Sequence, residues 1–220
     1  MNTLTIENLS YSYKGSDRKA LDNINVSFHG GKVYAVTGPS GSGKTTLLSI
    51  LAGLDVPTEG EVSINGTKLS TLDLDQYRRE QVSMIFQAFH LFPMLNVIEN
   101  VSFPMELNGV EREEARTRSK VFLNSVGITD EKHRRFPSNL SGGEQQRVAI
   151  ARTMASGARI ILADEPTGNL DKENGQNIVD ILKVLAHENG YCVIIVTHDP
   201  QIAAQADQVW KMDDGKMIPA

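Results

Sequence analysis

The chain has 220 residues, with 22 Lys and Arg against 27 Asp and Glu, and therefore a formal net charge of −5. This length is sufficient for a buried core, and 40% hydrophobic with 22% charged residues excludes an intrinsically disordered chain. The mild acidity gives no basic surface for nucleic acid, and no apolar run reaches the roughly 18 residues of a membrane span. The single Cys192 excludes an internal disulfide and the start of the chain lacks a signal-peptide pattern, so we expect a reducing compartment.

Apolar and polar residues alternate in two early segments. The first contains Leu4 and Ile6, and the second contains Ile24, Val26 and Phe28. Since side chains alternate between the faces of a sheet, this period of two predicts two half-buried strands.

Four further elements are predicted before residue 87. Residues 33–36 are a short apolar run that predicts a buried strand. From Lys44, leucines at helical spacing up to Leu54 predict a helix, which Gly53 and Pro57 help to stop. Residues 62–64 predict a strand that enters a tight turn at Asn65-Gly66, and 82–86 predict another buried strand.

The second half of the chain begins with helices. Residues 88–157 carry helical signals and little strand signal, including a charged helix over 111–126. Strand character returns at 160–163 and 193–196, with a helix over 175–188 between them. Strands alternating with helices, interrupted by a helical insertion, predict an α/β fold with a second lobe in one domain.

A glycine-rich loop lies between the strand at 33–36 and the helix that follows. Its residues 38–45 match the pattern G-x-x-x-x-G-K-[ST]. Glycines let successive N–H groups point into one concavity, where they bind phosphates together with the N-terminus of the helix. Lys44 would reach the β- and γ-phosphates, and the Thr45 hydroxyl would bind Mg²⁺. The alternative, a flexible Gly/Ser turn, does not explain this pattern in this position.

Two carboxylates, Asp164 and Glu165, follow the strand at 160–163. The carboxyl end of a parallel strand is where α/β folds place ligands. Asp164 suits Mg²⁺, which prefers oxygen ligands, and Glu165 could hold or deprotonate an attacking water. Alone, the pair would be an ordinary acidic strand end, and the phosphate loop upstream favours the catalytic interpretation.

Residues 140–146, with the sequence LSGGEQQ, have two interpretations. Ser141 with Glu144 three residues later is a capping box, which would simply begin a helix. The glycines after Ser141 would also leave N–H groups open to an anion, as a second phosphate site. Because one loop already surrounds the phosphates, this second site makes sense if it serves a nucleotide bound to another copy.

Together these motifs resemble the ATP-binding cassette (ABC) ATPases over nearly the whole chain. The loop at 38–45 resembles their Walker A motif, residues 140–146 their signature motif, and 160–165 their Walker B motif. Gln87 resembles their Q-loop glutamine and His198 their switch histidine, and 169–171 resemble their D-loop. The resemblance implies that Gln87 senses Mg²⁺ and faces a membrane partner, while His198 holds the γ-phosphate and the water beside Glu165.

The resemblance implies an α/β fold: a P-loop NTPase core with a mostly parallel sheet, an N-terminal antiparallel β-subdomain and an inserted helical subdomain. Within one domain (1–220), 1–87 and 158–220 would form the core and 88–157 the helical subdomain. It also implies an ATP-induced homodimer that closes head to tail around two ATP molecules. The nucleotide contacts would be Gly38, Pro39, Ser40, Gly41, Ser42, Gly43, Lys44, Thr45 and Thr46 of one copy and Ser141, Gly143 and Glu144 of the other. The metal would be held by Thr45, Gln87 and Asp164.

Aromatic residues mark two further expectations of the family. An aromatic before the phosphate loop stacks on adenine, and Tyr13 fits better than Tyr11, although both could be strand tyrosines on opposite faces. Apolar residues after Gln87 border the groove that receives a short helix of the membrane subunit. We expect most of them to be core, with one or two, such as Phe89 or Phe92, exposed.

Segments 51–60 and 86–101 are similar to one subgroup, the ATPases of lipoprotein release, macrolide export, antimicrobial-peptide resistance and a cell-division complex. The implied function is an ATP-hydrolysing subunit that drives an integral membrane permease, of the mechanotransmission or export type, at the cytoplasmic face of the membrane. The alternative is an ABC ATPase that actuates a non-transporting membrane complex controlling cell-wall hydrolysis. A soluble ABC protein of DNA repair or translation is disfavoured, because the chain has neither a second phosphate loop nor sustained heptads.

Overall fold

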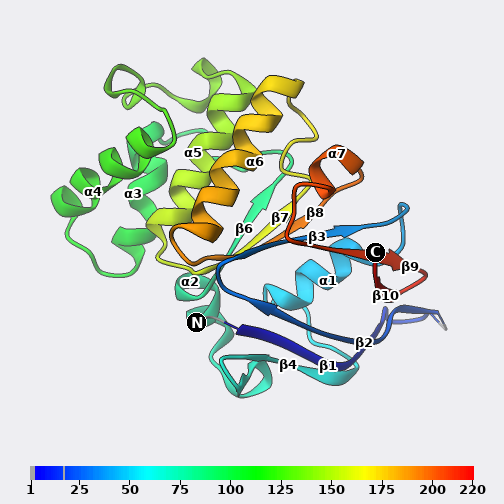
Figure 1. The fold of residues 1–220 in the computed structure, drawn as a ribbon. Coiled ribbons are helices and arrows are strands. Elements are labelled where there is room, and N and C mark those ends of the chain that lie inside the picture. The colour runs from blue at the N-terminus through cyan, green and yellow to red at the C-terminus, as the bar shows by residue number, and fades with distance from the viewer. Residues whose placement is uncertain (1–2, 17) are drawn as a thin grey trace.

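The computed structural model of the protein describes residues 3–16 and 18–220 (Figure 1). One part of the molecule is an antiparallel sheet of four strands. In pairing order its strands are β2 (Lys19–His29), β1 (Thr3–Ser12), β4 (Glu59–Ile64) and β5 (Thr67–Lys68). The alternation predicted on β1 and β2 is confirmed, because the apolar residues named for both strands are buried. The tight turn is confirmed as well, since Asn65 and Gly66 take φ values of 51° and 82°, as a type I′ turn requires.

A second sheet of six strands carries the core of the molecule. In pairing order its strands are β10 (Lys216–Pro219), β9 (Gln208–Asp213), β3 (Lys32–Thr37), β8 (Cys192–Val196), β7 (Ile160–Asp164) and β6 (Val82–Phe86). Every pair except β10 with β9 is parallel. The carboxyl ends of β3, β6, β7 and β8 therefore meet at one edge, where α/β folds bind ligands.

Helices cover both faces of the parallel sheet, which explains why its strands read as continuous apolar runs (Figure 1). Along β7, Ile160 and Leu162 face the core shared with α1 (Lys44–Leu51) and the antiparallel sheet. Ile161 and Ala163 face the helices on the other side. Those helices are α3 (Val97–Leu107), α4 (Arg112–Ser125), α5 (Gly142–Ala155) and α6 (Lys172–His187).

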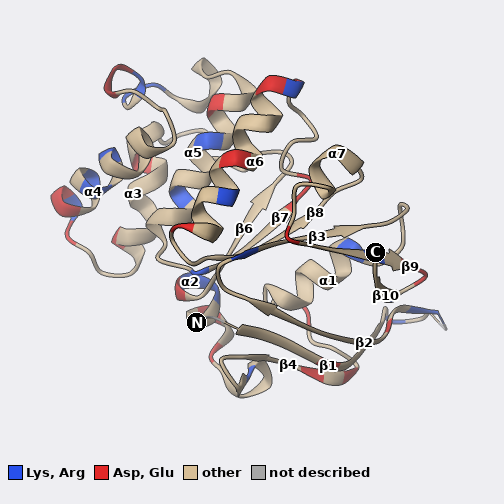
Figure 2. Ribbon diagram, viewed as in Figure 1, with Lys and Arg blue, Asp and Glu red and all other residues tan. Residues whose placement is uncertain are grey.

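The remaining helices are short: α2 (Leu74–Glu80), α7 (Pro200–Ala203), and three 3₁₀ turns, Leu69–Thr71, Asp130–Lys132 and Pro137–Asn139. Basic and acidic side chains are interspersed along α4, α5 and α6, so neither sign dominates them (Figure 2). Nowhere in 3–16 or 18–220 is a helix both long enough and apolar enough to span a membrane.

Two helix boundaries differ from the sequence predictions. The helix that begins at Lys44 ends at Leu51, and Gly53, named as a stop signal, takes a φ of 66°. Leu54, which the helical spacing included, lies outside the helix with 57% of its surface exposed. The helix predicted over 175–188 begins earlier, at Lys172, because the Asp171 side chain caps it by accepting a hydrogen bond from the Asn174 N–H.

Candidate ATP site

The phosphate loop joins the end of β3 to the start of α1. Gly38, Gly41 and Gly43 all have positive φ values, which only glycine adopts without strain. Side chains at two of these positions are also excluded by packing, since a Cβ at Gly38 or Gly43 would collide with a backbone carbonyl, that of Met212 or Ala20. The glycines are therefore required for both the conformation and the close packing of the loop.

Lys44 and two threonines begin α1. The Lys44 ammonium donates hydrogen bonds to the carbonyls of Gly38 and Pro39, each at 2.8 Å, so it lies at the mouth of the loop. The exposed Thr45 hydroxyl lies 3.5 Å from Asp164 Oδ2. Thr46 is buried, and its hydroxyl instead contacts the Tyr13 hydroxyl at 2.8 Å. Of the two adjacent hydroxyls, only that of Thr45 faces the carboxylate.

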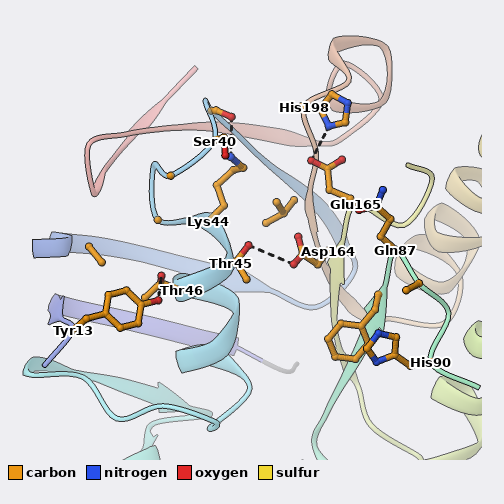
Figure 3. A pocket seen from close by; sticks show the side chains of 17 residues that line it. Tyr13, Ser40, Lys44, Thr45, Thr46, Gln87, His90, Asp164, Glu165 and His198 are labelled. Carbon is orange, nitrogen blue, oxygen red and sulfur yellow. Dashed lines mark hydrogen bonds and ion pairs between the residues drawn. The ribbon is translucent and has the colours of Figure 1, made fainter. Parts of the chain in front are cut away.

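A pocket with a volume of about 730 Å³ opens over this loop (Figure 3). The predicted residues that line it are Tyr13, Gly38, Ser40, Gly41, Gly43, Lys44, Thr45, Thr46, Gln87, Asp164, Glu165 and His198. Pro39 and Ser42 belong to the loop but do not line the pocket. The signature residues Ser141, Gly143 and Glu144 lie outside it.

The two carboxylates lie side by side at the end of β7. Asp164 is its last residue, and both burial and the charge of Glu165 raise the pKa of the Asp164 carboxyl. Glu165 has a φ of 47°, and its Oε1 lies 2.8 Å from Nδ1 of His198. That contact raises the pKa of His198, so the carboxylate favours the protonated imidazole.

Gln87 follows β6 and reaches the same pocket. Its Nε2 donates to Asn169 Oδ1 at 3.2 Å, and Asn169 Nδ2 donates back to the Gln87 carbonyl at 2.9 Å. This pair fixes Gln87 against the segment that follows Glu165, at the edge where the carboxylates lie.

Ser141 and Glu144 form the capping box predicted by the first interpretation of this segment, in which it begins a helix. The Ser141 hydroxyl accepts from the Glu144 N–H at 3.3 Å, and Glu144 Oε2 accepts from the Ser141 N–H at 2.8 Å. Glu144 Oε1 accepts from Lys132 at 2.6 Å, which holds the pKa of the Glu144 carboxyl below its usual range. Both oxygens of Glu144 are therefore engaged within its own chain.

The aromatic residues divide between core and surface. Tyr11 lies in β1 and packs on the core, whereas Tyr13 follows the end of the strand and is half exposed, so the two are not tyrosines on opposite faces of one strand. Phe89 is half-buried, while Phe92 and Met94 are exposed. Phe92 lines a groove with Phe103.

His90 lines the pocket and was not predicted from the sequence. Its ring stacks on Phe86, with centroids 4.6 Å apart. Phe89 and His90 both take positive φ values, 60° and 46°, and the Arg152 guanidinium donates to their carbonyls at 3.2 and 2.7 Å. The placement of His90 depends on this backbone conformation, for which the sequence gives no signal such as a glycine.

Comparisons with known proteins agree on one family. The sequence pattern of the ABC transporter family matches residues 21–168. The dimeric structure of MJ0796, a bacterial ABC transporter cassette, has a TM-score of 0.87 and 39% identity over 97% of this chain and 95% of its own. A post-hydrolysis dimer of MJ0796 bound to ADP and Pi has a TM-score of 0.88 and 38% identity over 98% of both chains.

Curated relatives give the same assignment. An uncharacterized ABC transporter ATP-binding protein of Mycobacterium tuberculosis, Rv0986, is 42% identical over 98% of this chain and 88% of its own length. The macrolide export ATP-binding/permease protein MacB of Salmonella typhimurium is 44% identical over 98% of this chain, which spans 34% of MacB. The α/β cassette with its mostly parallel sheet and phosphate loop is an ATPase domain, and the chain belongs to the ABC transporter family.

Proposed function

We propose that two copies of this chain close head to tail around two ATP molecules and drive an integral membrane permease at the cytoplasmic face of the membrane. One observation carries this proposal. The pocket contains the phosphate loop and both carboxylates, whereas Ser141 and Gly143 lie outside it. A second copy would supply the missing residues. The dimeric form of the similar MJ0796 cassette supports this arrangement.

The proposed chemistry assigns a task to each group around the pocket. Lys44 and the loop N–H groups would neutralise the phosphate oxygens, where negative charge develops during transfer. Glu165 would orient the attacking water and accept its proton, and His198 would hold the γ-phosphate beside it. Tyr13, at the pocket rim, would stack on the adenine. Ser141 and Gly143 would contact the γ-phosphate held by the other copy.

The residues at the strand edge fit a magnesium ion. Thr45, Asp164 and Gln87 all offer oxygen atoms, the ligands that Mg²⁺ prefers. Burial and the charge of the adjacent Glu165 raise the pKa of Asp164, and a cation would relieve the repulsion between the two carboxylates. When bound with ATP, the ion would neutralise charge on the β- and γ-phosphates.

The permease contact is proposed for the groove lined by Phe92, Phe103, Pro104 and Leu107. Three of these residues, Phe92, Phe103 and Leu107, are exposed apolar side chains, typical of a protein-binding surface. The segment 87–92 runs from the ATP pocket to this groove, so ATP binding and permease contact would share one short connection. MacB, whose name joins an ATP-binding part to a permease, supports a partner of the export type.

The experiment that tests the proposal is light scattering after size-exclusion chromatography of the Glu165→Gln variant. We expect a shift from one copy to two on adding Mg-ATP, and a fall in turnover of about 10²–10⁴-fold, the range for loss of a general base. Lys44→Ala in the same background is the control, because it should lose nucleotide binding and remain monomeric. A Glu165→Gln protein that binds ATP but stays monomeric would contradict the proposed composite site.

A further inference from the structure

The first turn of α5 contains two glycines at positions where glycine is unfavourable. Gly142 and Gly143 both have helical backbone angles with negative φ, which any residue adopts. In a helix glycine is about 1 kcal/mol less favourable than alanine, so two adjacent glycines need a reason other than backbone conformation.

The two glycines differ in the space around them. A Cβ at Gly142 would meet its nearest atoms, in Leu170 and Phe89, at 3.4 Å, which is an ordinary contact. A Cβ at Gly143 would lie 2.7 Å from Cγ of Asn174, and closer still to its Oδ1, so either the Asn174 side chain or α5 would have to move. Of these two glycines, only Gly143 has a neighbour in its own chain that obstructs a side chain.

Asn174 is held in place from its other side. It lies in the first turn of α6, where its N–H donates to Asp171 Oδ1 at 2.9 Å and its Nδ2 donates to Asp171 Oδ2 at 2.7 Å. These two bonds to one carboxylate fix the amide group, which leaves its oxygen against Gly143.

A second contact, one turn further along α5, joins this helix to the loop that precedes α6. The fully buried Gln146 donates from Nε2 to the Pro166 carbonyl at 2.8 Å. The start of α5 is therefore docked at two points on the residues that follow Glu165, whereas Ser141 and its glycines remain outside the ATP pocket.

We propose that Asn174 is a positioning residue for the signature turn. Fixed by Asp171, it seats α5 at Gly143 and sets the direction in which Ser141 and Gly143 face the ATP of the second copy. This inference rests on the proposed dimer. The glycine at 143 is then required by contact with Asn174 of its own chain, in addition to any contact with the partner's nucleotide.

The test is a double-mutant cycle in the Glu165→Gln background. Gly143→Ala should weaken ATP-dependent dimerisation at least about tenfold, and Asn174→Ala alone about threefold, while neither changes ATP affinity of the monomer. The double variant should recover most of the loss caused by Gly143→Ala, because the obstructing amide is gone. Asn174→Gly, combined with Gly143→Ala, gives a second double variant. It is needed because in Asn174→Ala the Cβ of residue 174 would still lie 3.1 Å from the new methyl group at position 143.

Gly142→Ala is the matched control, because its Cβ has room within the chain and Asn174→Ala should not rescue it. Thermal melting of the four monomers gives a readout that does not depend on the dimer. Additive effects of the two substitutions on both dimerisation and melting would overturn the inference, because the glycine would then serve only the partner's nucleotide. A Glu165→Gln parent that never dimerises would overturn the proposed function instead, and non-additive melting would still establish the contact.

Discussion

Arg152 offers a quantitative test of how the segment after Gln87 is held. Its guanidinium donates to the carbonyls of Phe89 and His90 and lies over the Phe92 ring, 5.7 Å from the centroid. No carboxylate among the described residues pairs with it, and burial lowers the pKa of Arg152. The guanidinium therefore serves the backbone carbonyls rather than an ion pair.

Arg152→Met keeps the apolar stem and removes both hydrogen bonds. Bonds to charged groups contribute about 1.5–3 kcal/mol each, and two factors reduce the sum here: the bond to His90 is exposed, and burying the charge is unfavourable. The free energy of unfolding should therefore fall by about 2–3 kcal/mol, which for a chain of this length lowers the melting temperature by about 4–12 °C.

Melting measurements with hydrogen exchange would check this prediction. The amides of Phe89 and His90 should exchange faster in Arg152→Met, because both residues would leave their left-handed conformation. Arg118→Met is the control, since Arg118 is half exposed and paired only with Glu114, a type of contact worth about 0.5 kcal/mol or less. Equal, small effects of the two substitutions would refute the idea that Arg152 holds this segment.

Three further predictions concern single side chains. NMR titration should give His198 a pKa above its usual value, which returns toward that value in Glu165→Gln because the carboxylate causes the shift. Burial raises the pKa of the Cys192 thiol to about 12, so a thiol reagent should modify it only as fast as the protein unfolds, and rapid labelling of the folded protein would contradict its burial. Tyr13→Ala should weaken ATP binding by about 5- to 150-fold, the range for loss of one base–aromatic stack, whereas Tyr11→Ala should mainly lower the melting temperature.

The parallel strands and the phosphate loop could be predicted from sequence because the signal lies in the residues themselves. Strands buried on both faces are continuous apolar runs, as in Ile160–Asp164, and a loop with required glycines has a fixed spacing. The hairpin of β9 and β10 was not predicted. β10 is the edge strand of the sheet and β9 lies next to it. Both mix exposed polar residues such as Lys211 with apolar ones, so neither a period of two nor an apolar run is distinct.

The contacts between distant segments could not be predicted for a different reason. The stack of His90 on Phe86 requires positive φ at Phe89 and His90, neither of which is glycine. The contact of Asn174 with Gly143 requires that the N-terminal turns of α5 and α6 lie side by side. Both depend on tertiary packing rather than on local propensity. The capping box at Ser141 illustrates the same limit, since it is fully satisfied within the chain and the local pattern alone indicates only a helix start.

The adjacent carboxylates give a final prediction, in which the sign of a stability change depends on pH. Burial and the charge of Glu165 raise the pKa of the partly buried Asp164. Above that pKa the repulsion between the two ionised carboxylates costs stability, and Glu165→Gln removes this repulsion. The charge of Glu165 also raises the pKa of His198 in the folded protein. The ion pair therefore stabilises the fold at pH values below the pKa of His198 in the unfolded chain, and this stabilisation is lost as the pH rises through the pKa of His198 in the folded protein.

Without nucleotide or Mg²⁺, Glu165→Gln should therefore melt about 1–3 °C above the parent protein near about pH 8.5, where only the repulsion remains. Near about pH 5.5 the lost ion pair with His198 opposes that gain, and the difference should shrink or reverse. His198→Gln is the control, because in that background the stabilisation by Glu165→Gln should persist at the lower pH. A difference in melting temperature that is constant with pH would mean that Glu165 acts on neither neighbour through its charge.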